Sequence, residues 1–390
     1  MHFDRISTAV GNYDQIAQKH TAKFGAGYAF NLCGRPSFAV LWNRKEGVDM
    51  GQSRTRIVDI AEALGLSTAT VSKVIHGKTE KISEETVKRV QQELERTGYI
   101  PNMAGILLAR NNSRIIGVVV NDHVKYEGRV LEDGFVMSSL NALSHEVNHK
   151  GYFLMIKTTA DIRQIPVFAS MWNMDGLILM GFCEADYERL RNQMRISFVV
   201  YDGYFEKCSK VVNLVTDHYD GGYQAGHYFK ELGHKKALCI SDNYICMDKE
   251  RIDGFQKAFA PGQTRIWQIP NREKNRITFY EKHFPEFLSS GIRAVFAVSD
   301  NYALEFMRFL QGKGIRIPED VQIIGFDDTL SSRESRPALT TIHQDAALRA
   351  QNAIACIEAM RDGRACEAGI VLPVRLIKRG STEVLTCQDL

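Results

Sequence analysis

The sequence predicts an N-terminal all-α helix-turn-helix headpiece followed by an α/β core with parallel sheets. Two observations lead to this fold class. Residues 54–110 show short helical apolar periods separated by glycine turns. From Ile115 onward, apolar strands alternate with amphipathic helices, which is the pattern of βαβ units. The chain has 390 residues, 44% of them hydrophobic, which is enough for two or three domains.

Within the first zone, apolar residues recur at i, i+3, i+4 and i+7 from Ile57 and predict a short helix. Gly65 is placed to end that helix in a left-handed conformation. Ser67 is then placed to cap a second helix over residues 68–75, and Ser83 opens a third. Two short helices joined through a glycine turn are typical of a helix-turn-helix.

The second of these helices exposes small polar residues and a lysine on one face, namely Thr68, Ala69, Ser72, Lys73 and His76. Thr and Ser can bond base edges or phosphates, and Lys can donate to guanine O6 and N7. This chemistry favours DNA binding. A plain three-helix bundle with a solvated polar face is the alternative that spacing leaves open.

Charge supports an anionic partner near the N-terminus. Residues 51–114 contain ten Lys and Arg against seven Asp and Glu, whereas residues 115–390 contain 33 against 35. No apolar run approaches the ~20 residues of a membrane span, so no membrane partner is predicted. Eight cysteines without a Cys-x-x-Cys pair are typical of reduced thiols, which predicts a cytoplasmic protein without a metal or other cofactor.

The core is predicted to hold about ten strands, too many for one compact sheet, so two sheets are expected. The predicted strands are 115–120, 152–156, 176–180, 197–201, 211–215, 236–240, 266–269, 294–298, 321–326 and 371–377. The predicted helices are 130–150, 219–232, 249–259, 302–313 and 345–361. Ligands of such sheets bind beyond the carboxyl ends of the strands. The polar residues there are Asn121, Asp122, Asp202, Ser241, Asp242, Ser299, Asp300, Asp327 and Asp328.

Several segments closely resemble one known family. Residues 57–77 resemble the helix-turn-helix of LacI/GalR transcriptional regulators, as do residues 82–86 and 98–102. The resemblance continues in order through Gly221-Gly222-Tyr223-Gln224-Ala225-Gly226, Arg251-Ile252-Asp253-Gly254-Phe255, Ile324-Gly325-Phe326-Asp327 and Arg379-Gly380-Ser381-Thr382. It covers about residues 55–382.

The resemblance implies a two-lobed, periplasmic-binding-protein-like core behind a headpiece and a hinge helix. The implied headpiece spans residues 51–100, the hinge and linker 101–114, and the effector-binding and dimerisation core 115–382, followed by a tail, 383–390. The first lobe is expected at about 115–213 and 345–371, and the second at about 214–344 and 372–382. Residues 1–50 precede the usual family start. We hypothesise that residues 1–49 are an over-extended gene start, with translation beginning at Met50. The alternative is a genuine flexible extension.

The resemblance further implies a homodimer that binds a pseudo-palindromic double-stranded DNA operator and represses transcription. By position, the base-reading residues are Thr68, Ala69 and Lys73, and the phosphate-contacting residues are Ser67, Ser72, Ser83, Thr86, Tyr99 and Asn102. Leu108 matches the hinge leucine that wedges into the minor groove, and Ala109 its neighbour. The hinge departs from the family at Gly105-Ile106-Leu107, which either weakens the helix or strengthens hinge–hinge contact.

For the core, the resemblance implies an allosteric small-molecule effector, a sugar or related metabolite. Arg251 and Asp327 match the positions that bond its polar edge. Ser299 and Asp300 lie at the equivalent strand end, and Asp122 and Tyr126 follow the first strand. An arginine can fork across two oxygens, and a carboxylate can accept two hydroxyls. The alternative is that Arg251 and Asp327 merely pair with each other across the lobes.

Two other classes of protein are disfavoured. A literal His-Glu-x-x-His at His145, Glu146 and His149 matches a zinc protease, but the helix period places both histidines on the solvent side. The sequence therefore predicts no enzyme. A solute-binding protein without DNA function is disfavoured because the headpiece is present and no secretory signal is seen.

Overall fold

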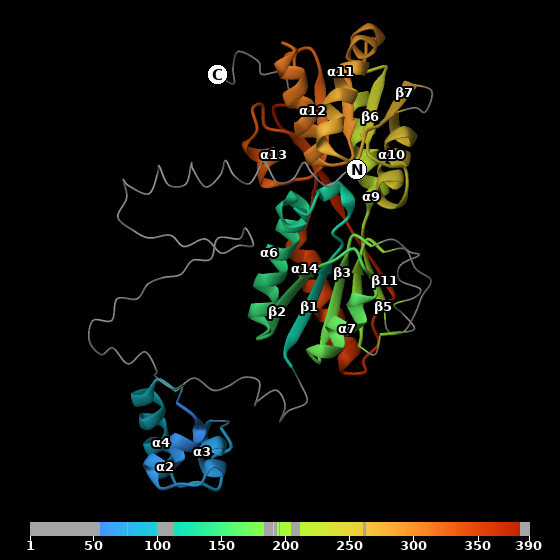
Figure 1. The fold of residues 1–390 in the computed structure, drawn as a ribbon. Coiled ribbons are helices and arrows are strands. Elements are labelled where there is room, and N and C mark those ends of the chain that lie inside the picture. Colours follow the sequence, from blue (N-terminus) through green and yellow to red (C-terminus); the bar gives the residue numbers. More distant parts are fainter. Residues whose placement is uncertain are drawn as a thin grey trace, which may run out of the picture. The chain divides into compact units, whose positions relative to one another are not determined.

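The computed structural model describes residues 55–75, 77–99, 113–182, 190, 193–194, 196–203, 211–259 and 263–382. The chain divides into two compact units, residues 1–101 and 102–390. The described part of the first unit is helical, and that of the second contains two sheets flanked by helices (Figure 1). Predictions for residues 1–50, 101–112 and 383–390 lie outside the described residues.

The first unit consists of α2 (Ile57–Leu64), α3 (Thr68–Ile75) and α4 (Glu84–Thr97). Gly65 ends α2 with a left-handed φ of 63°. Ser67 caps α3 by accepting a hydrogen bond from the backbone N–H of Thr70 at 3.1 Å. Both local signals were therefore interpreted correctly from the sequence. The helices pack around five buried side chains, Ile60, Ala61, Val71, Val74 and Val90.

The first sheet of the core is fully parallel, with strand order β11-β5-β4-β3-β1-β2. Its strands are β1 (Ile115–Val120), β2 (Phe153–Thr158), β3 (Gly176–Met180), β4 (Phe198–Tyr201), β5 (Val211–Thr216) and β11 (Gly369–Leu372). The register pairs Val118 with Ile156 on one side and with Ile178 on the other. The central strands are continuous apolar runs because helices cover both faces of the sheet.

The second sheet has the order β12-β10-β9-β8-β6-β7. Its strands are β6 (Ala237–Ser241), β7 (Thr264–Gln268), β8 (Ala294–Ala297), β9 (Gln322–Asp327), β10 (Thr340–Gln344) and β12 (Val374–Ile377). All pairings are parallel except that of β12 with β10. We call the halves built on the two sheets the first lobe (residues 113–216 and 345–372) and the second lobe (217–344 and 373–382).

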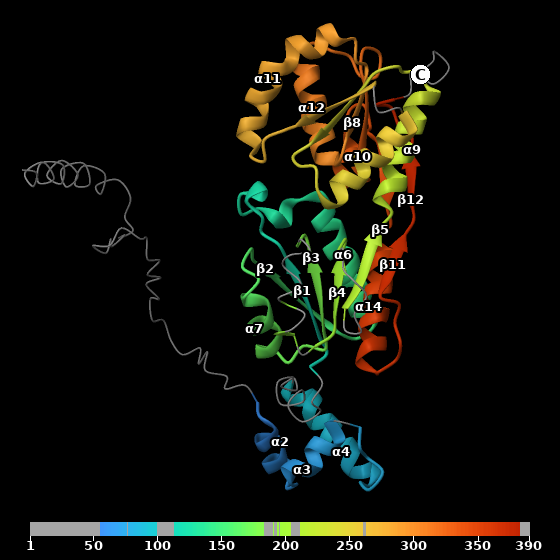
Figure 2. The ribbon, with the colours of Figure 1, turned by 90° about the vertical axis from the view of Figure 1, so that its right-hand side faces the viewer.

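Helices complete both lobes. The first lobe carries two 3₁₀ turns, η1 (Val124–Tyr126) and η2 (Val130–Glu132), with α6 (Gly134–His149), α7 (Gln164–Met171) and α14 (Ala346–Arg361). The second carries α9 (His218–Glu231), α10 (Cys246–Phe259), α11 (Glu273–Ser290), α12 (Asp300–Gly312) and α13 (Leu330–Glu334). Figure 2 shows α9 and α10 on one side of the second sheet and α11 and α12 on the other. No helix of the described residues is long and apolar enough to cross a membrane.

The predicted fold class is confirmed, but two strand predictions were wrong. The segment 371–377 is not one strand: it forms the end of β11 in the first sheet and all of β12 in the second. Pro373 separates them, because proline has no N–H to donate to a ladder. Strand β10 was missed because its residues Thr340–Gln344 are mostly polar, although most of them are buried.

The chain passes between the lobes three times, at residues 216–218, 344–346 and 372–374. Asp217 stands at the first crossing, where its side chain caps α9 by accepting from the backbone N–H of Asp220 at 2.9 Å. The carboxyl ends of the parallel strands of each sheet thus lie toward the crossings and toward the other lobe (Figure 1).

Candidate functional site

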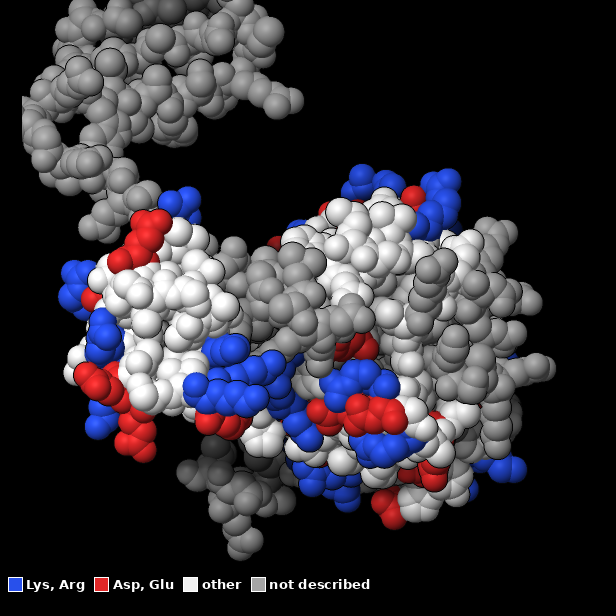
Figure 3. All heavy atoms as spheres, turned by 90° about the horizontal axis from the view of Figure 1, so that it is seen from below, with Lys and Arg blue, Asp and Glu red and all other residues white. Residues whose placement is uncertain are grey.

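Helix α3 presents the residues proposed to read bases. Thr68, Ala69 and Lys73 are exposed and Ser72 is half-buried, whereas Val71 and Val74 face the core of the unit. In the face drawn in Figure 3, basic and acidic side chains are interspersed over the described residues, so charge alone does not mark a DNA surface. The sequence of α3 contains one basic residue, Lys73, and no acidic one.

Three of the residues proposed to contact phosphates, Ser67, Ser83 and Thr86, lie at helix starts, whereas Ser72 lies within α3 and Tyr99 follows α4. The hydroxyl of Ser83 accepts from the backbone N–H of Thr86 at 3.3 Å, which caps α4. The starts of α3 and α4 therefore carry hydroxyls at the N-terminal ends of helices, a combination suited to anions. Tyr99 is half-buried against the core of the unit. Asn102, Leu108 and Ala109 lie outside the described residues.

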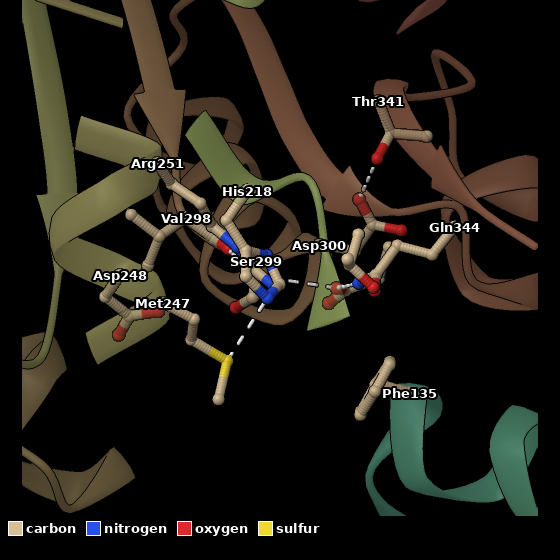
Figure 4. Close-up of polar contacts among 12 residues, drawn as sticks. Phe135, His218, Met247, Asp248, Arg251, Val298, Ser299, Asp300, Thr341 and Gln344 are labelled. Atoms are coloured by element: carbon tan, nitrogen blue, oxygen red, sulfur yellow. Dashed lines mark hydrogen bonds and ion pairs between the residues drawn. The ribbon is translucent and has the colours of Figure 1, made fainter. Parts of the chain in front are cut away.

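A cavity of about 130 Å³ lies between the two lobes. Both lobes contribute polar and aromatic side chains to it. From the first lobe come Asn121, Lys125, Tyr126, Asp133, Phe135, Tyr201 and Asp202, and from the second Met247, Asp248, Arg251, Arg276, Ser299, Asn301, Tyr302 and Asp327. Figure 4 shows Phe135 on α6 facing residues of the second lobe.

Arg251 is held rigidly in this cavity. Its Nε donates to His218 Nδ1 at 3.2 Å, and its Nη1 donates to the carbonyl oxygen of Val298 (Figure 4). Its guanidinium carbon lies 3.7 Å from the ring centroid of Phe326, a cation–π stacking distance. The side chain is thus fixed in a plane before any ligand arrives.

Asp327 ends β9 beside Arg251. Its Oδ1 lies 3.8 Å from Arg251 Nη1 and accepts from Gln344 Nε2 at 2.7 Å. Burial raises the pKa of Asp327 well above its usual value. The residue has φ 122°, a strained conformation that is typical of functional sites. The alternative interpretation was wrong in one respect: the two residues do contact each other, but within the second lobe, not across the lobes.

Asp300, predicted as an effector contact, does not line this cavity. Its side chain is fully buried and accepts from the N–H and hydroxyl of Thr329 at 2.8 and 3.0 Å and from the hydroxyl of Thr341 at 2.5 Å. Burial raises the pKa of Asp300 to about 6. It ties α12 to β10 and to the start of α13. Its neighbour Ser299 lines the cavity and caps α12.

After β1, the structure brings Tyr126 into the cavity but not Asp122. The neighbours of Asp122 take its place: Asn121, whose Nδ2 donates to the carbonyl oxygen of Gly181 at 2.7 Å, and Lys125. Lys125 Nζ lies 5.2 Å from the ring centroid of Tyr126. Asp122 does not line this cavity, and its backbone N–H donates to the carbonyl oxygen of Thr159 at 3.4 Å. Its role as an effector contact stays a prediction.

The sequence did not predict a buried network of polar contacts beside the cavity, formed by His218, Asp202 and Arg349. His218 Nε2 lies 2.9 Å from Asp202 Oδ1, and Arg349 Nη2 lies 2.5 Å from the same oxygen. Burial lowers the pKa of His218 to about 4. Burial opposes ionisation of Asp202, yet Arg349 and His218 together hold its pKa below the usual range. The sequence separations of 16 and 147 residues leave no local signal that could have revealed this network.

A second missed feature is a buried ion pair that lines the cavity. Arg276 on α11 donates to Glu305 on α12 at 2.7–3.0 Å, and both residues are at most 6% exposed. Neither α11 nor this contact was predicted. The guanidinium of Arg276 is therefore largely committed to Glu305 and to the carbonyl oxygen of Asn271.

The His-Glu-x-x-His pattern lies on α6 with His145 and His149 exposed, as expected for a solvated helix face. Among the described residues, no group of His, Cys, Asp and Glu is arranged to hold a metal ion.

The site and the fold define a two-lobed ligand-binding protein joined to a helix-turn-helix. Residues 56–102 match the model of bacterial regulatory proteins of the lacI family, and residues 227–382 match the periplasmic-binding-protein-like domain. The chain is 30% identical over 304 residues to the transcriptional repressor PurR of Vibrio atlanticus, covering 74% of this chain and 86% of that one. It is 26% identical over 354 residues to the regulator DegA of Bacillus subtilis, covering 85% and 99%.

The chain therefore belongs to the LacI/GalR family and is a DNA-binding transcriptional regulator. Solved structures agree on the fold. The lac repressor dimer bound to operator and anti-inducer superimposes with a TM-score of 0.72 at 21% identity, covering 85% of this chain and 99% of that one. The regulator CelR in complex with cellobiose gives 0.60 at 20% identity, covering 84% and 100%.

Proposed function

We propose that this chain is a homodimeric repressor that reads an operator with α3 and is switched by a neutral, sugar-like effector in the cavity between its lobes. The observation that supports the effector class is the set of groups around Arg251. A fixed guanidinium, the buried carboxylates of Asp248 and Asp327 and the rings of Phe135 and Tyr302 line one cavity. Hydroxyls donate to carboxylates, and the CH faces of a sugar pack on aromatic rings.

The raised pKa values of the carboxylates support a neutral effector. Burial raises the pKa of Asp248 and Asp133, as it does that of Asp327. A phosphate or carboxylate placed beside these carboxyl groups would disfavour their ionised forms further. Hydroxyl groups, by contrast, can form hydrogen bonds with them without adding charge. We therefore expect no sugar phosphate to bind tightly.

We assign the proposed functions to three consecutive segments of the chain. Residues 51–100 form the operator-binding headpiece, 101–114 the hinge and linker, and 115–382 the effector-binding core. In this proposal, Thr68, Ala69 and Lys73 contact bases, and Leu108 with Ala109 enters the minor groove. The residues that contact phosphates are Ser67, Ser72, Ser83, Thr86, Tyr99 and Asn102. Such a protein acts on DNA in the cytoplasm. No catalytic step is proposed, since the relatives are regulators.

Replacing Lys73 with alanine is expected to weaken binding to the cognate operator by about 1–3 kcal/mol, because one base-edge donor is lost. Fluorescence anisotropy on an operator selected from a random duplex pool measures the change. Lys88→Ala is the matched control, since it removes the same charge from an exposed position on α4. Equal losses in both variants would show that Lys73 acts by charge alone.

Replacing Arg251 with alanine is expected to abolish effector binding while operator binding without effector persists. Calorimetry with cellobiose and with D-ribose, the sugar bound to a related regulator from Enterococcus faecium, supplies the test. Arg251→Lys keeps the positive charge but loses the bidentate geometry of the guanidinium, and we expect its affinity for the sugar to be at least tenfold weaker. Binding of unchanged strength in Arg251→Ala would remove this residue from the site, and a wild-type chain that binds no neutral sugar would refute the effector class.

The homodimer has a candidate surface on the first lobe. Val167, Met171 and Trp172 on and after α7 are 57%, 73% and 50% exposed, and Phe153 on the edge strand β2 is 51% exposed. Three of these side chains belong to one short helical segment and the fourth to the edge strand, and large exposed apolar side chains and open sheet edges are features of protein interfaces. We propose that a second copy covers it, and sedimentation of the full chain should give a dimer mass.

A further inference from the structure

His218 lies where the effector-binding second lobe meets the first. It is the first residue of α9, directly after the first crossing, and its side chain is completely buried. Its ring contacts Phe326 at a centroid distance of 5.8 Å, and Phe326 in turn stacks on Arg251. This buried imidazole lies at a lobe boundary and contacts Arg251, the residue that we place against the effector. Packing alone does not explain such a position.

The hydrogen-bond partners of His218 determine its protonation. A guanidinium has no acceptor, so the 3.2 Å contact from Arg251 Nε requires His218 Nδ1 to accept. The hydrogen of the neutral ring must then reside on Nε2, which donates to Asp202 Oδ1 at 2.9 Å. The burial that lowers the pKa of His218 to about 4 agrees with a neutral ring. Each ring nitrogen thus has one fixed role.

The two ends of this hydrogen-bond chain belong to different lobes. Arg251 on α10 belongs to the second lobe, and Asp202 follows β4 in the first. Asp202 is itself held in place by the backbone N–H of Thr216 at 3.1 Å and by Arg349 Nη2 at 2.5 Å. A displacement of one lobe against the other at this boundary must therefore stretch the bond at His218 or shift the guanidinium of Arg251.

The guanidinium has little freedom to respond in another way. Phe326 lies against one of its faces, and the carbonyl oxygen of Val298 accepts from Nη1. The bond from Nε to His218 sets the remaining in-plane direction. In that orientation Nη2 lies 3.9 Å from the sulfur of Met247, which lines the cavity together with Arg251 (Figure 4).

We propose that His218 is a positioning residue: as the neutral Nε2–H tautomer it aims Arg251 into the cavity and ties it to Asp202 of the opposite lobe. A ligand that moves Arg251 is thereby coupled to the placement of the lobes. This role rests on the proposed effector function of Arg251, but the hydrogen-bond chain itself does not, and the two are tested separately.

The tautomer is tested without any ligand. Nitrogen-15 histidine spectra of the full chain should show one ring with its proton on Nε2 that stays neutral to about pH 5, and His218→Asn should delete this signal. Exposed His227, on the same helix, gives the control variant His227→Asn. A proton on Nδ1, or a charged ring at pH 7, would overturn the proposal.

The positioning role is tested by two variants of His218, each of which keeps one of its two hydrogen bonds. The side-chain oxygen of asparagine stands where Nδ1 accepts from Arg251, and the amide nitrogen of glutamine stands where Nε2 donates to Asp202. With D-ribose as probe, His218→Asn should bind within about threefold of wild type and His218→Gln at least tenfold more weakly. Equal losses in both variants would indicate packing alone and refute positioning.

The coupling between lobes is tested by thermal unfolding. The losses in Tm caused by Arg251→Lys and Asp202→Asn should be non-additive in the wild-type background and additive when His218→Asn is also present. Additivity in both backgrounds would overturn the coupling. If the wild-type chain binds no D-ribose, the choice of effector fails, whereas the spectra and the unfolding data still decide the role of His218.

Discussion

Replacing Gly222 with alanine is expected to lower the free energy of unfolding of the core by about 3 kcal/mol or more. A Cβ at this position would overlap the carbonyl oxygen of Arg251, and one at Gly254 would overlap that of Tyr219. Helices α9 and α10 thus meet backbone to backbone, and neither can yield by rotating a side chain. Urea unfolding followed by circular dichroism measures the loss.

Gly312→Ala is the matched control. Gly312 ends α12 in an ordinary helical conformation, and a Cβ there meets nothing within 4 Å. Alanine should stabilise that position by up to ~1 kcal/mol. Similar unfolding midpoints for Gly222→Ala and Gly312→Ala would contradict the close approach of the two helices. Because Gly222 faces Arg251 directly, we also expect weaker effector binding in any Gly222→Ala protein that folds.

Lowering the pH from 6.5 to 4 is expected to destabilise the core through His218. Burial lowers its folded pKa to about 4, below the value of about 6.5 in the unfolded chain. The unfolded chain therefore binds a proton first, and stability that is complete above pH 6.5 is lost as the pH falls, by up to ~3 kcal/mol. The charged groups that face the ring are Asp202 and Arg251, with Arg349 behind Asp202.

The comparison with His218→Asn isolates this contribution. Burial raises the pKa of Asp300 to about 6, so this carboxyl changes stability with the opposite sign over the same interval. Because Asp300 is present in both proteins, the difference between their unfolding free energies at pH 7 and at pH 5 reports on His218. Parallel pH profiles would contradict a buried neutral imidazole.

The headpiece could be predicted closely because its determinants are local. Gly65 and Ser67 act within one turn of their own positions, and the apolar period from Ile57 specifies the buried face. Most strands and five helices of the core were also found from periodicity. The exceptions are β10, where polar residues are buried, the apolar run that proline splits between two sheets, and the helices α7, α11 and α13, which were not predicted.

The cavity could be predicted only in part. A position after a parallel strand identifies candidates, but it does not distinguish Asp327, which lines the cavity, from Asp300, which is turned into the core. That outcome depends on Thr329 and Thr341, far along the chain, which supply hydrogen bonds to Asp300. Contacts such as that between Arg276 and Glu305 likewise require the packed helices, which a period in the sequence does not specify.

The three crossings between the lobes also bear on when each part can fold during synthesis. The first sheet is completed by β11 and the second by β12, at residues 369–377, close to the end of the chain. The headpiece, by contrast, is complete once residue 99 has left the ribosome. A nascent chain can therefore carry a folded DNA-binding unit while more than two hundred residues are still to be translated. Both lobes obtain their last strand, and with it the cavity between them, only after residues 369–377 have been synthesised.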